Sequence, residues 1–184
     1  MYRAIYALPI SYTIFFLLIA LALWQMLRTL LSGRRVLRIL CAVLFAAWLY
    51  TVLELTVLSR SFGTETRVYL MPFRQLKMYL DGVNDELLRS FWMNVLLFTP
   101  CGFVLPELLP KQLPFAVRLA LTLGFALGLS VMVEAAQWYW RLGETECDDV
   151  IANTSGALLG MCLTHIADRL CRSVRSLVSL SHRR

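Results

Sequence analysis

The chain has 184 residues, of which 59% are hydrophobic, and its formal net charge is +6. The mean hydropathy is +0.65, and several apolar runs approach or exceed the ~20 residues that a helix needs to cross a bilayer. This composition excludes a soluble globular protein. The basic residues lie at the ends of the apolar runs and in the C-terminal tail, which argues against nucleic acid as a partner and favours anionic membrane lipids. We predict an all-α, polytopic transmembrane helical bundle of about five spans, without a β-sheet, that forms a single membrane domain over residues 1–184.

The first two predicted spans flank an arginine-rich turn. An apolar run from about Tyr6 to Leu31 is longer than the ~7–15-residue core of a signal peptide and is interpreted as an uncleaved anchor. A second run extends from about Val36 to Leu58. The turn between them is expected on the cytoplasmic side, because it gathers Arg28, Arg34, Arg35 and Arg38.

Residues 59–90 form the longest polar segment. After Pro72, apolar residues recur at helical spacing from Phe73 to Leu80, which indicates a short helix on the membrane surface. A connecting loop with a packed turn explains the segment equally well. Both interpretations stay open.

The third span begins near Phe91 and is rich in proline. The stretch from Asn94 to Pro110 contains Pro100, Pro106 and Gly102. Proline removes a backbone hydrogen bond and clashes with the preceding turn, and in lipid the freed carbonyl must find another donor. A kink or an unwound turn is therefore predicted around Pro100.

The fourth span, Leu119 to Val133, and the fifth, Val150 to Leu170, each carry a pair of glycines four residues apart. Small residues at this spacing let membrane helices approach closely. The pattern therefore predicts that both spans lie in the core of the bundle. The pairs are Gly124 with Gly128 and Gly156 with Gly160.

Polar residues are concentrated around the turn between the last two spans. Because a carboxylate on a membrane helix costs about 2.5–3.5 kcal/mol on insertion scales, it usually faces an interior or a cavity and marks a functional site. Two helical stripes, Ser130 to Arg141 and Asp149 to Gly160, meet at the acidic turn Glu144–Asp149. We expect one ligand-binding polar cavity lined by Asn94, Glu134, Gln137, Arg141, Asp148, Asp149 and Asn153.

The distribution of basic residues predicts the orientation of the chain. With five spans, an outside N-terminus and a cytoplasmic C-terminus place most of the 18 lysines and arginines on the inside. The acidic turn and the start of the third span then face outward.

The sequence indicates no cofactor. The five cysteines form no CxxC pair, and His165 and His182 have no ligand or triad pattern around them. Most of the cysteines are interpreted as apolar fillers of membrane helices.

Three segments resemble the VanZ-like family of small bacterial membrane proteins. Asn94 to Phe103 reads NVLLFTPCGF, similar to the family's Asn-x-Leu-Leu-Phe-x-Pro-x-Gly-Phe signature. Ser130, Glu134 and Gln137 are similar to its Ser-x-x-x-Glu-x-x-Gln element. The third segment matches its Arg, Asp-Asp and Asn-x-x-Gly pattern, with Arg141, Asp148, Asp149, Asn153 and Gly156.

A weaker similarity is Tyr69 to Phe73, YLMPF, where the family commonly has asparagine in place of Tyr69. Glu146 likewise stands where an aspartate is usual. The resemblance covers roughly residues 67–163. It implies a multi-pass protein of the bacterial cytoplasmic membrane in the cell envelope, and a link to glycopeptide (teicoplanin) resistance, for which the family is named.

Three functions fit these observations. The first is a non-enzymatic protein whose cavity binds a lipid-linked envelope precursor, a lipoglycopeptide or another lipid-like ligand, with the Arg141 guanidinium gripping a phosphate or carboxylate. The second is a metal-dependent membrane enzyme acting on a lipid phosphate, with Glu134 as general base and Asp148 and Asp149 on a divalent cation. The third is a structural or interaction protein in which the polar residues tie helices together.

Overall fold

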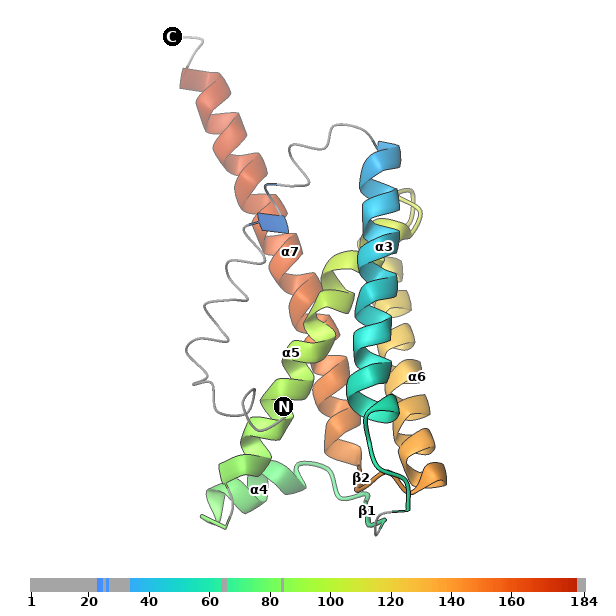
Figure 1. The fold of residues 1–184 in the computed structure, drawn as a ribbon. Coiled ribbons are helices and arrows are strands. Elements are labelled where there is room, and N and C mark those ends of the chain that lie inside the picture. The colour runs from blue at the N-terminus through green and yellow to red at the C-terminus, as the bar shows by residue number, and fades with distance from the viewer. Residues whose placement is uncertain (1–22, 25, 27–33, 64–65, 84, 182–184) are drawn as a thin grey trace.

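The computed structural model describes residues 23–24, 26, 34–63, 66–83 and 85–181 (Figure 1). Long helices dominate this part of the chain, so the predicted all-α, polytopic architecture is confirmed. The predicted first span, Tyr6 to Leu31, lies almost entirely outside the described residues. In chain order the elements are α3 (Arg34–Leu53), the π-helical turn η1 (Glu54–Leu58), β1 (Val68–Tyr69), α4 (Arg74–Leu80), α5 (Asp85–Leu108), α6 (Phe115–Trp140), β2 (Thr145–Glu146) and α7 (Cys147–Ser181).

Four described helices are long and apolar enough to cross a membrane. They correspond to the second to fifth predicted spans, and α6 extends beyond both predicted ends, so that Glu134 and Gln137 lie on the helix. Large apolar side chains such as Val43, Leu121 and Val131 are exposed along these helices. A bilayer solvates such side chains, whereas water does not. The candidate spans are Arg35–Leu58, Glu86–Leu108, Phe115–Trp140 and Cys147–Leu170.

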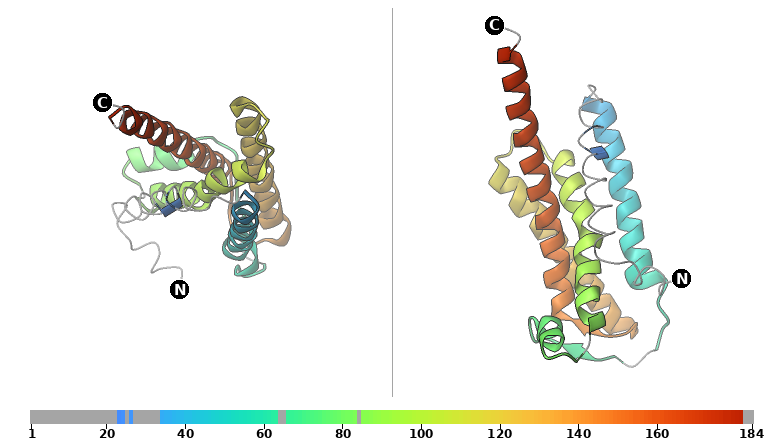
Figure 2. Two further views of the ribbon diagram at one scale, coloured as in Figure 1. Left: turned by 90° about the horizontal axis from the view of Figure 1, so that it is seen from above. Right: turned by 90° about the vertical axis from the view of Figure 1, so that its left-hand side faces the viewer.

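Successive spans alternate in direction. The start of α5, the end of α6 and the start of α7 lie together with α4, β1 and β2 at one end, which we name the polar end (Figure 1). The start of α3, the turn between α5 and α6, and the C-terminal half of α7 lie at the opposite end. Figure 2 shows α7 projecting beyond the other helices there. We name this the basic end, because it carries Arg35, Arg38, Lys111, Arg118 and Arg169.

A small parallel sheet at the polar end corrects the prediction of a chain without strands. Val68 pairs with Thr145 and Tyr69 pairs with Glu146, and the Thr145 N–H also donates to the Arg67 carbonyl at 2.9 Å. Each strand is only two residues long, too short for the alternating pattern that signals a strand in sequence. The sheet joins the polar segment before α4 to the turn between α6 and α7.

Helix α5 continues through Pro100 and Pro106 without an unwound turn. Side chains supply donors next to the missing proline N–H: Trp48 Nε1 donates to the Leu97 carbonyl at 2.7 Å, and Thr99 Oγ1 donates to the Val95 carbonyl at 2.8 Å. Neither bond reaches the Leu96 carbonyl, which is the one that loses its donor to Pro100, but they add hydrogen bonds to the carbonyls on either side of it. A bend of the axis at Pro100 stays a prediction.

Glycines bring the backbones of α5 and α7 together. A Cβ built on Gly156 would lie 2.1 Å from the Val95 carbonyl oxygen, and one on Gly160 would lie 2.2 Å from the Thr99 oxygen. On α5, a Cβ on Gly102 would lie 2.1 Å from the Ala157 oxygen. No side chain fits at these positions, so the predicted close approach through Gly156 and Gly160 is confirmed.

The similar pair on α6 does not have this role among the described residues. Apart from the adjacent backbone of α6 itself, no atom of that part of the chain lies within 4 Å of a Cβ built on Gly124 or Gly128. The prediction of close packing through this pair is corrected. The buried core of the bundle instead meets α6 at Ala126, Leu129 and Val133.

An aromatic contact fills the space between α3 and α5. The rings of Trp48 and Phe98 meet edge to face with centroids 5.5 Å apart. Val52 and Cys101 are fully buried beside them. Dispersion contacts of this kind stabilise helix packing in a bilayer, where apolar surface gains little from leaving lipid.

The glycine contact makes a quantitative prediction about stability. Gly156→Ala places a methyl group against the Val95 carbonyl and should lower the free energy of unfolding by about 1–3 kcal/mol or more. Gly128→Ala meets open space and gains helix propensity, so it should be neutral or stabilising by about 0.5–1 kcal/mol. Thermal unfolding of both variants in the same detergent checks this. Equal melting temperatures for the two variants would contradict the assignment of the contact.

Candidate functional site

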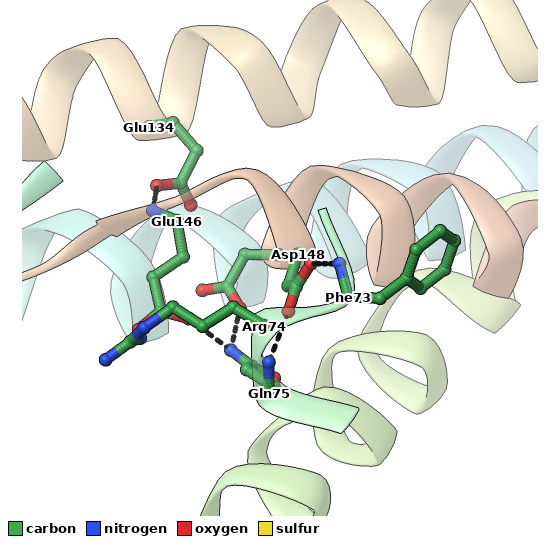
Figure 3. Close-up of polar contacts among 7 residues, drawn as sticks. Phe73, Arg74, Gln75, Glu134, Glu146 and Asp148 are labelled. Carbon is green, nitrogen blue, oxygen red and sulfur yellow. Dashed lines mark hydrogen bonds and ion pairs between the residues drawn. The ribbon is translucent and has the colours of Figure 1, made fainter. Parts of the chain in front are cut away.

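Buried carboxylates from three elements gather at the polar end. Glu134 comes from α6, Glu146 from β2 and Asp148 from the first turn of α7, and they are 7%, 6% and 2% exposed. Arg74 and Gln75 of α4 face them from the other side (Figure 3). We name these residues, with Asp149, the acidic cluster.

Asp148 holds the beginning of α4 in place. One carboxylate oxygen accepts the Phe73 N–H at 2.5 Å and the other accepts the Gln75 N–H at 2.7 Å (Figure 3). The first N–H groups of a helix have no partner within the helix, and a negative charge there is favourable. Phe73 has the left-handed φ of 59°, which is uncommon for a residue with a side chain. Asp148, which is far from α4 in the sequence, thus stabilises this unusual turn.

Gln75 connects α4 to two further carboxylates. Its Nε2 donates to Glu146 Oε2 at 2.6 Å and to Asp149 Oδ1 at 3.2 Å. Arg74 adds an ion pair to Glu146 Oε1 at 3.2 Å, and its guanidinium lies 3.5 Å above the ring centre of Tyr69. Arg74 therefore compensates part of the negative charge of the cluster, and Gln75 donates hydrogen bonds to its carboxylates.

The Glu134 carboxylate is held in place by a backbone N–H group. Its Oε2 accepts the Glu146 N–H at 2.9 Å, so β2 fixes the position of the carboxylate inside α6 (Figure 3). The positive charge of Arg60 acts on both Glu134 and Asp149. Gly143, with a φ of 134°, lies beside Arg60, and a Cβ there would come within 3.3 Å of the guanidinium. Gly143 therefore leaves room for Arg60 in the turn.

The remaining predicted residues occupy different places. Gln137 Nε2 donates to the Thr56 carbonyl of η1 at 3.0 Å, and Asn153 Nδ2 donates to Ser130 Oγ at 2.8 Å. Asn94 lies close enough to Asp149 for its side chain to act on that carboxylate. Arg141 ends α6 in a left-handed conformation and is exposed, so it lies outside the buried group. Ligand binding by all seven predicted residues stays a prediction.

The buried amides leave several oxygen atoms without a donor. Among the described residues, no donor reaches Gln75 Oε1, Gln137 Oε1 or Asn153 Oδ1, although the three residues are only 2–3% exposed. A buried acceptor left unpaired costs about 1–3 kcal/mol. Two buried hydroxyls at the same end, Thr66 Oγ1 and Thr145 Oγ1, also have no partner within the described part of the chain. The amide oxygens and the buried carboxylates leave hydrogen-bond acceptors open at the polar end. A group that brings hydrogen-bond donors suits it chemically.

The sequence alone leaves open whether the carboxylates of this region bind a metal ion. Within the described part of the chain, no three His, Cys, Asp or Glu side chains are arranged to hold a metal ion.

Sequence reasoning missed four members of this region as site residues: Arg60, Arg74, Gln75 and Glu146. The motif Tyr69 to Phe73 lies directly before α4 and could have drawn attention to Arg74 and Gln75. Glu146 stood within the acidic turn but was not included in the predicted site. Nothing in the sequence singles out Arg60 among the other basic residues of its segment.

Glu146 lies between two spans, and ionisation of its carboxyl makes the stability of the cluster depend on pH. Burial raises the pKa of Glu146 above its ordinary value, and neighbouring Glu144 raises it further, whereas Gln75 and Arg74 act in the opposite direction. For a carboxyl with a raised pKa, the contribution to stability is complete below the unfolded pKa of about 4.3. That contribution is lost as the pH rises through the folded pKa.

Glu146→Gln should therefore change the pH dependence of stability. The variant resembles the protonated side chain, so its melting temperature relative to wild type should rise between about pH 4 and pH 8. Asp81→Asn removes one negative charge from the exposed end of α4 and serves as the control. Thermal unfolding across this pH range measures both differences. If the melting temperature of Glu146→Gln falls relative to wild type as the pH rises, the assigned direction of the Glu146 pKa shift is wrong.

Comparison with known proteins yields one match. A family model described as VanZ/LLP1 covers residues 15–168 and so includes the predicted core 67–163. No curated protein and no solved structure matches the chain. The family resemblance read from the motifs is confirmed, and because the match covers most of the chain, this membrane protein belongs to the VanZ/LLP1 family.

Proposed function

We propose that this protein binds the polar head of an amphiphilic envelope molecule at its acidic cluster, without transforming it. The observation that carries the proposal is the set of open acceptors: buried amide oxygens for which the described residues offer no donor lie at the same end as the carboxylates of Glu134, Glu146 and Asp149. The ligand class is therefore a lipid-linked or lipid-like molecule whose head presents ammonium, amide or hydroxyl donors.

A purely structural role explains part of the geometry. Asp148 organises α4, and Asn153 joins α7 to α6, as in many helical membrane proteins. Such contacts use the N–H groups at the start of α4 and the amide of Asn153. They leave the oxygen atoms of Gln75 and Gln137 unsatisfied, and a bound head group would supply what the fold lacks.

The chemistry of the cluster changes the expected mode of recognition. An exposed Arg141 is poorly placed to hold a phosphate against Glu134, whereas a donor-bearing group fits the carboxylates directly. A lipid-linked envelope precursor or a lipoglycopeptide combines acyl chains with amide and amine donors and belongs to this class. We propose that binding of such a molecule links the protein to glycopeptide (teicoplanin) resistance.

A matched pair of simple amphiphiles tests the ligand class. Decylamine should raise the melting temperature of the purified protein, whereas decanoic acid, with the same chain length, should not. Glu134→Gln keeps an acceptor for the Glu146 N–H but removes the charge, so the apparent affinity for decylamine should fall about tenfold. Asp81→Asn, which alters an exposed carboxylate at the same end, should behave as wild type. Stabilisation by decanoic acid, or equal effects of the two variants, would contradict the proposal.

We further propose that the polar end faces outward in the cytoplasmic membrane, with the N-terminus outside and the C-terminus inside. In a background without native cysteines, Glu144→Cys should react with a membrane-impermeant maleimide in intact cells, because Glu144 is exposed in the turn at the polar end. Gln112→Cys, exposed in the turn at the basic end, should react only after lysis. The reverse labelling pattern would invert the topology.

A further inference from the structure

Residues 70–83, which contain α4, present an apolar surface at the polar end. We name them the surface segment. Single exposed apolar side chains are ordinary, whereas a dense group of them marks a surface that contacts a membrane or another partner. In this segment the exposed apolar residues include Leu70, Met71, Phe73, Leu76, Leu80 and Val83.

The faces of α4 differ in chemistry. Gln75 is 2% exposed, and its side chain points into the acidic cluster, where it donates to two carboxylates. Leu76 and Leu80, four residues apart, share a different face and are 43% and 73% exposed. Lys77 is exposed beside them. The outward side of α4 therefore combines leucines with a cation, as in helices that lie in the plane of a membrane surface.

The position of α4 relative to the spans places it at the membrane boundary. It lies across the bundle, at the start of α5, rather than alongside the spans (Figure 1 and Figure 2). Only four residues separate the end of α4 from Asp85, where α5 begins. The candidate span in α5 begins at Glu86. The surface segment is thus at the level where this span leaves the hydrocarbon.

Aromatic residues mark the same level independently. Trp92 near the start of α5 and Trp138, Tyr139 and Trp140 at the end of α6 are all exposed. Tryptophan and tyrosine collect where a membrane meets water, because their rings are amphipathic. Tyr79 of α4, also exposed, adds to this belt. The partner that fits the surface segment is therefore the lipid that surrounds the spans.

We propose that the surface segment lies in the interfacial layer of the leaflet at the polar end, with Leu76 and Leu80 among the acyl chains. The ammonium of Lys77 extends to the lipid phosphates while its alkyl stem stays beside the leucines. Of the two interpretations that the sequence leaves open for this segment, these observations favour the helix on the membrane surface. Because Gln75 is on another face of the same helix, the leaflet also holds α4 against the acidic cluster.

Fluorescence quenching tests the location. In a background without native cysteines, Leu80→Cys labelled with bimane should lose most of its fluorescence in vesicles of phosphatidylcholine brominated on its acyl chains. Glu144→Cys, exposed in the turn at the same end, is the control and should keep most of its fluorescence. Aqueous iodide should quench the two labels in the reverse order. Equal quenching of the two labels by the brominated lipid would overturn the proposal, and so would a disulfide-linked dimer as the main product of Leu80→Cys, because a second copy would then cover this face.

Hydrogen exchange in lipid nanodiscs tests the anchoring of α4. Leu80 is 73% exposed, so its truncation to alanine removes few contacts within the protein, and alanine is the stronger helix former. Leu80→Ala should nevertheless raise the exchange of the α4 amides about tenfold, the change expected when about two CH₂ groups lose their lipid contact. Asp81→Ala, at the next exposed position, should leave the exchange unchanged.

Equal exchange in the Leu80 and Asp81 variants would show that the leaflet does not hold α4, and would contradict the proposal. Neither measurement uses a ligand of the acidic cluster. Their outcome is therefore independent of whether the cluster binds an amphiphile.

Discussion

The contact between the backbones of α5 and α7 is the constraint on which the rest of the molecule depends. Gly102, Gly156 and Gly160 have no room for a side chain, so the two helices meet at one register. In a bilayer, association of this kind depends on close packing, because apolar surface gains little from leaving lipid. The register explains why Val95 lies against Gly156 while the preceding Asn94 reaches Asp149 on α7.

The same contact organises both ends of the bundle. Toward the polar end it leads to Asp149 and Asn153, and toward the basic end it leads to Met161, Thr164 and a cavity beside Arg118. The two ends differ in chemistry. The polar end has buried amide oxygens without a donor among the described residues, whereas the basic end contains the buried Arg118 Nε–H, for which those residues offer no acceptor. A polar amphiphile at the first would complete a hydrogen-bond set that the chain leaves incomplete.

Much of the fold could be predicted from the sequence, because membrane spans are signalled locally. Apolar runs gave the helices, and the stripe containing Glu134 and Gln137 correctly indicated buried polar residues on α6. The contacts of the cluster could not be predicted in the same way. Asp148 bonds to the backbone of Phe73 and Gln75, and no local pattern connects a carboxylate to amides so far away in the chain.

Two apparently similar features illustrate this limit. Gly124 with Gly128 and Gly156 with Gly160 have the same spacing, yet only the second pair faces another backbone among the described residues. The spacing of residues along the sequence shows which of them share a helix face. Which segment packs against that face depends on how the bundle assembles. Arg60 and Arg141 differ for the same reason: the turn with Gly143 directs Arg60 toward the carboxylates, whereas Arg141 ends its helix exposed.

The continuity of α7 has a mechanical consequence. This helix runs from Cys147 to Ser181 without interruption, and it carries Asp149 near one end of the bundle and Asp168 near the other. The two carboxylates are separated by about 28 Å along a rod with a rise of ~1.5 Å per residue. Any translation or rotation of this rod moves both of them together. A ligand that favoured one position of α7 at one end would therefore act on the other end, and by thermodynamic reciprocity the effect would be equal in both directions.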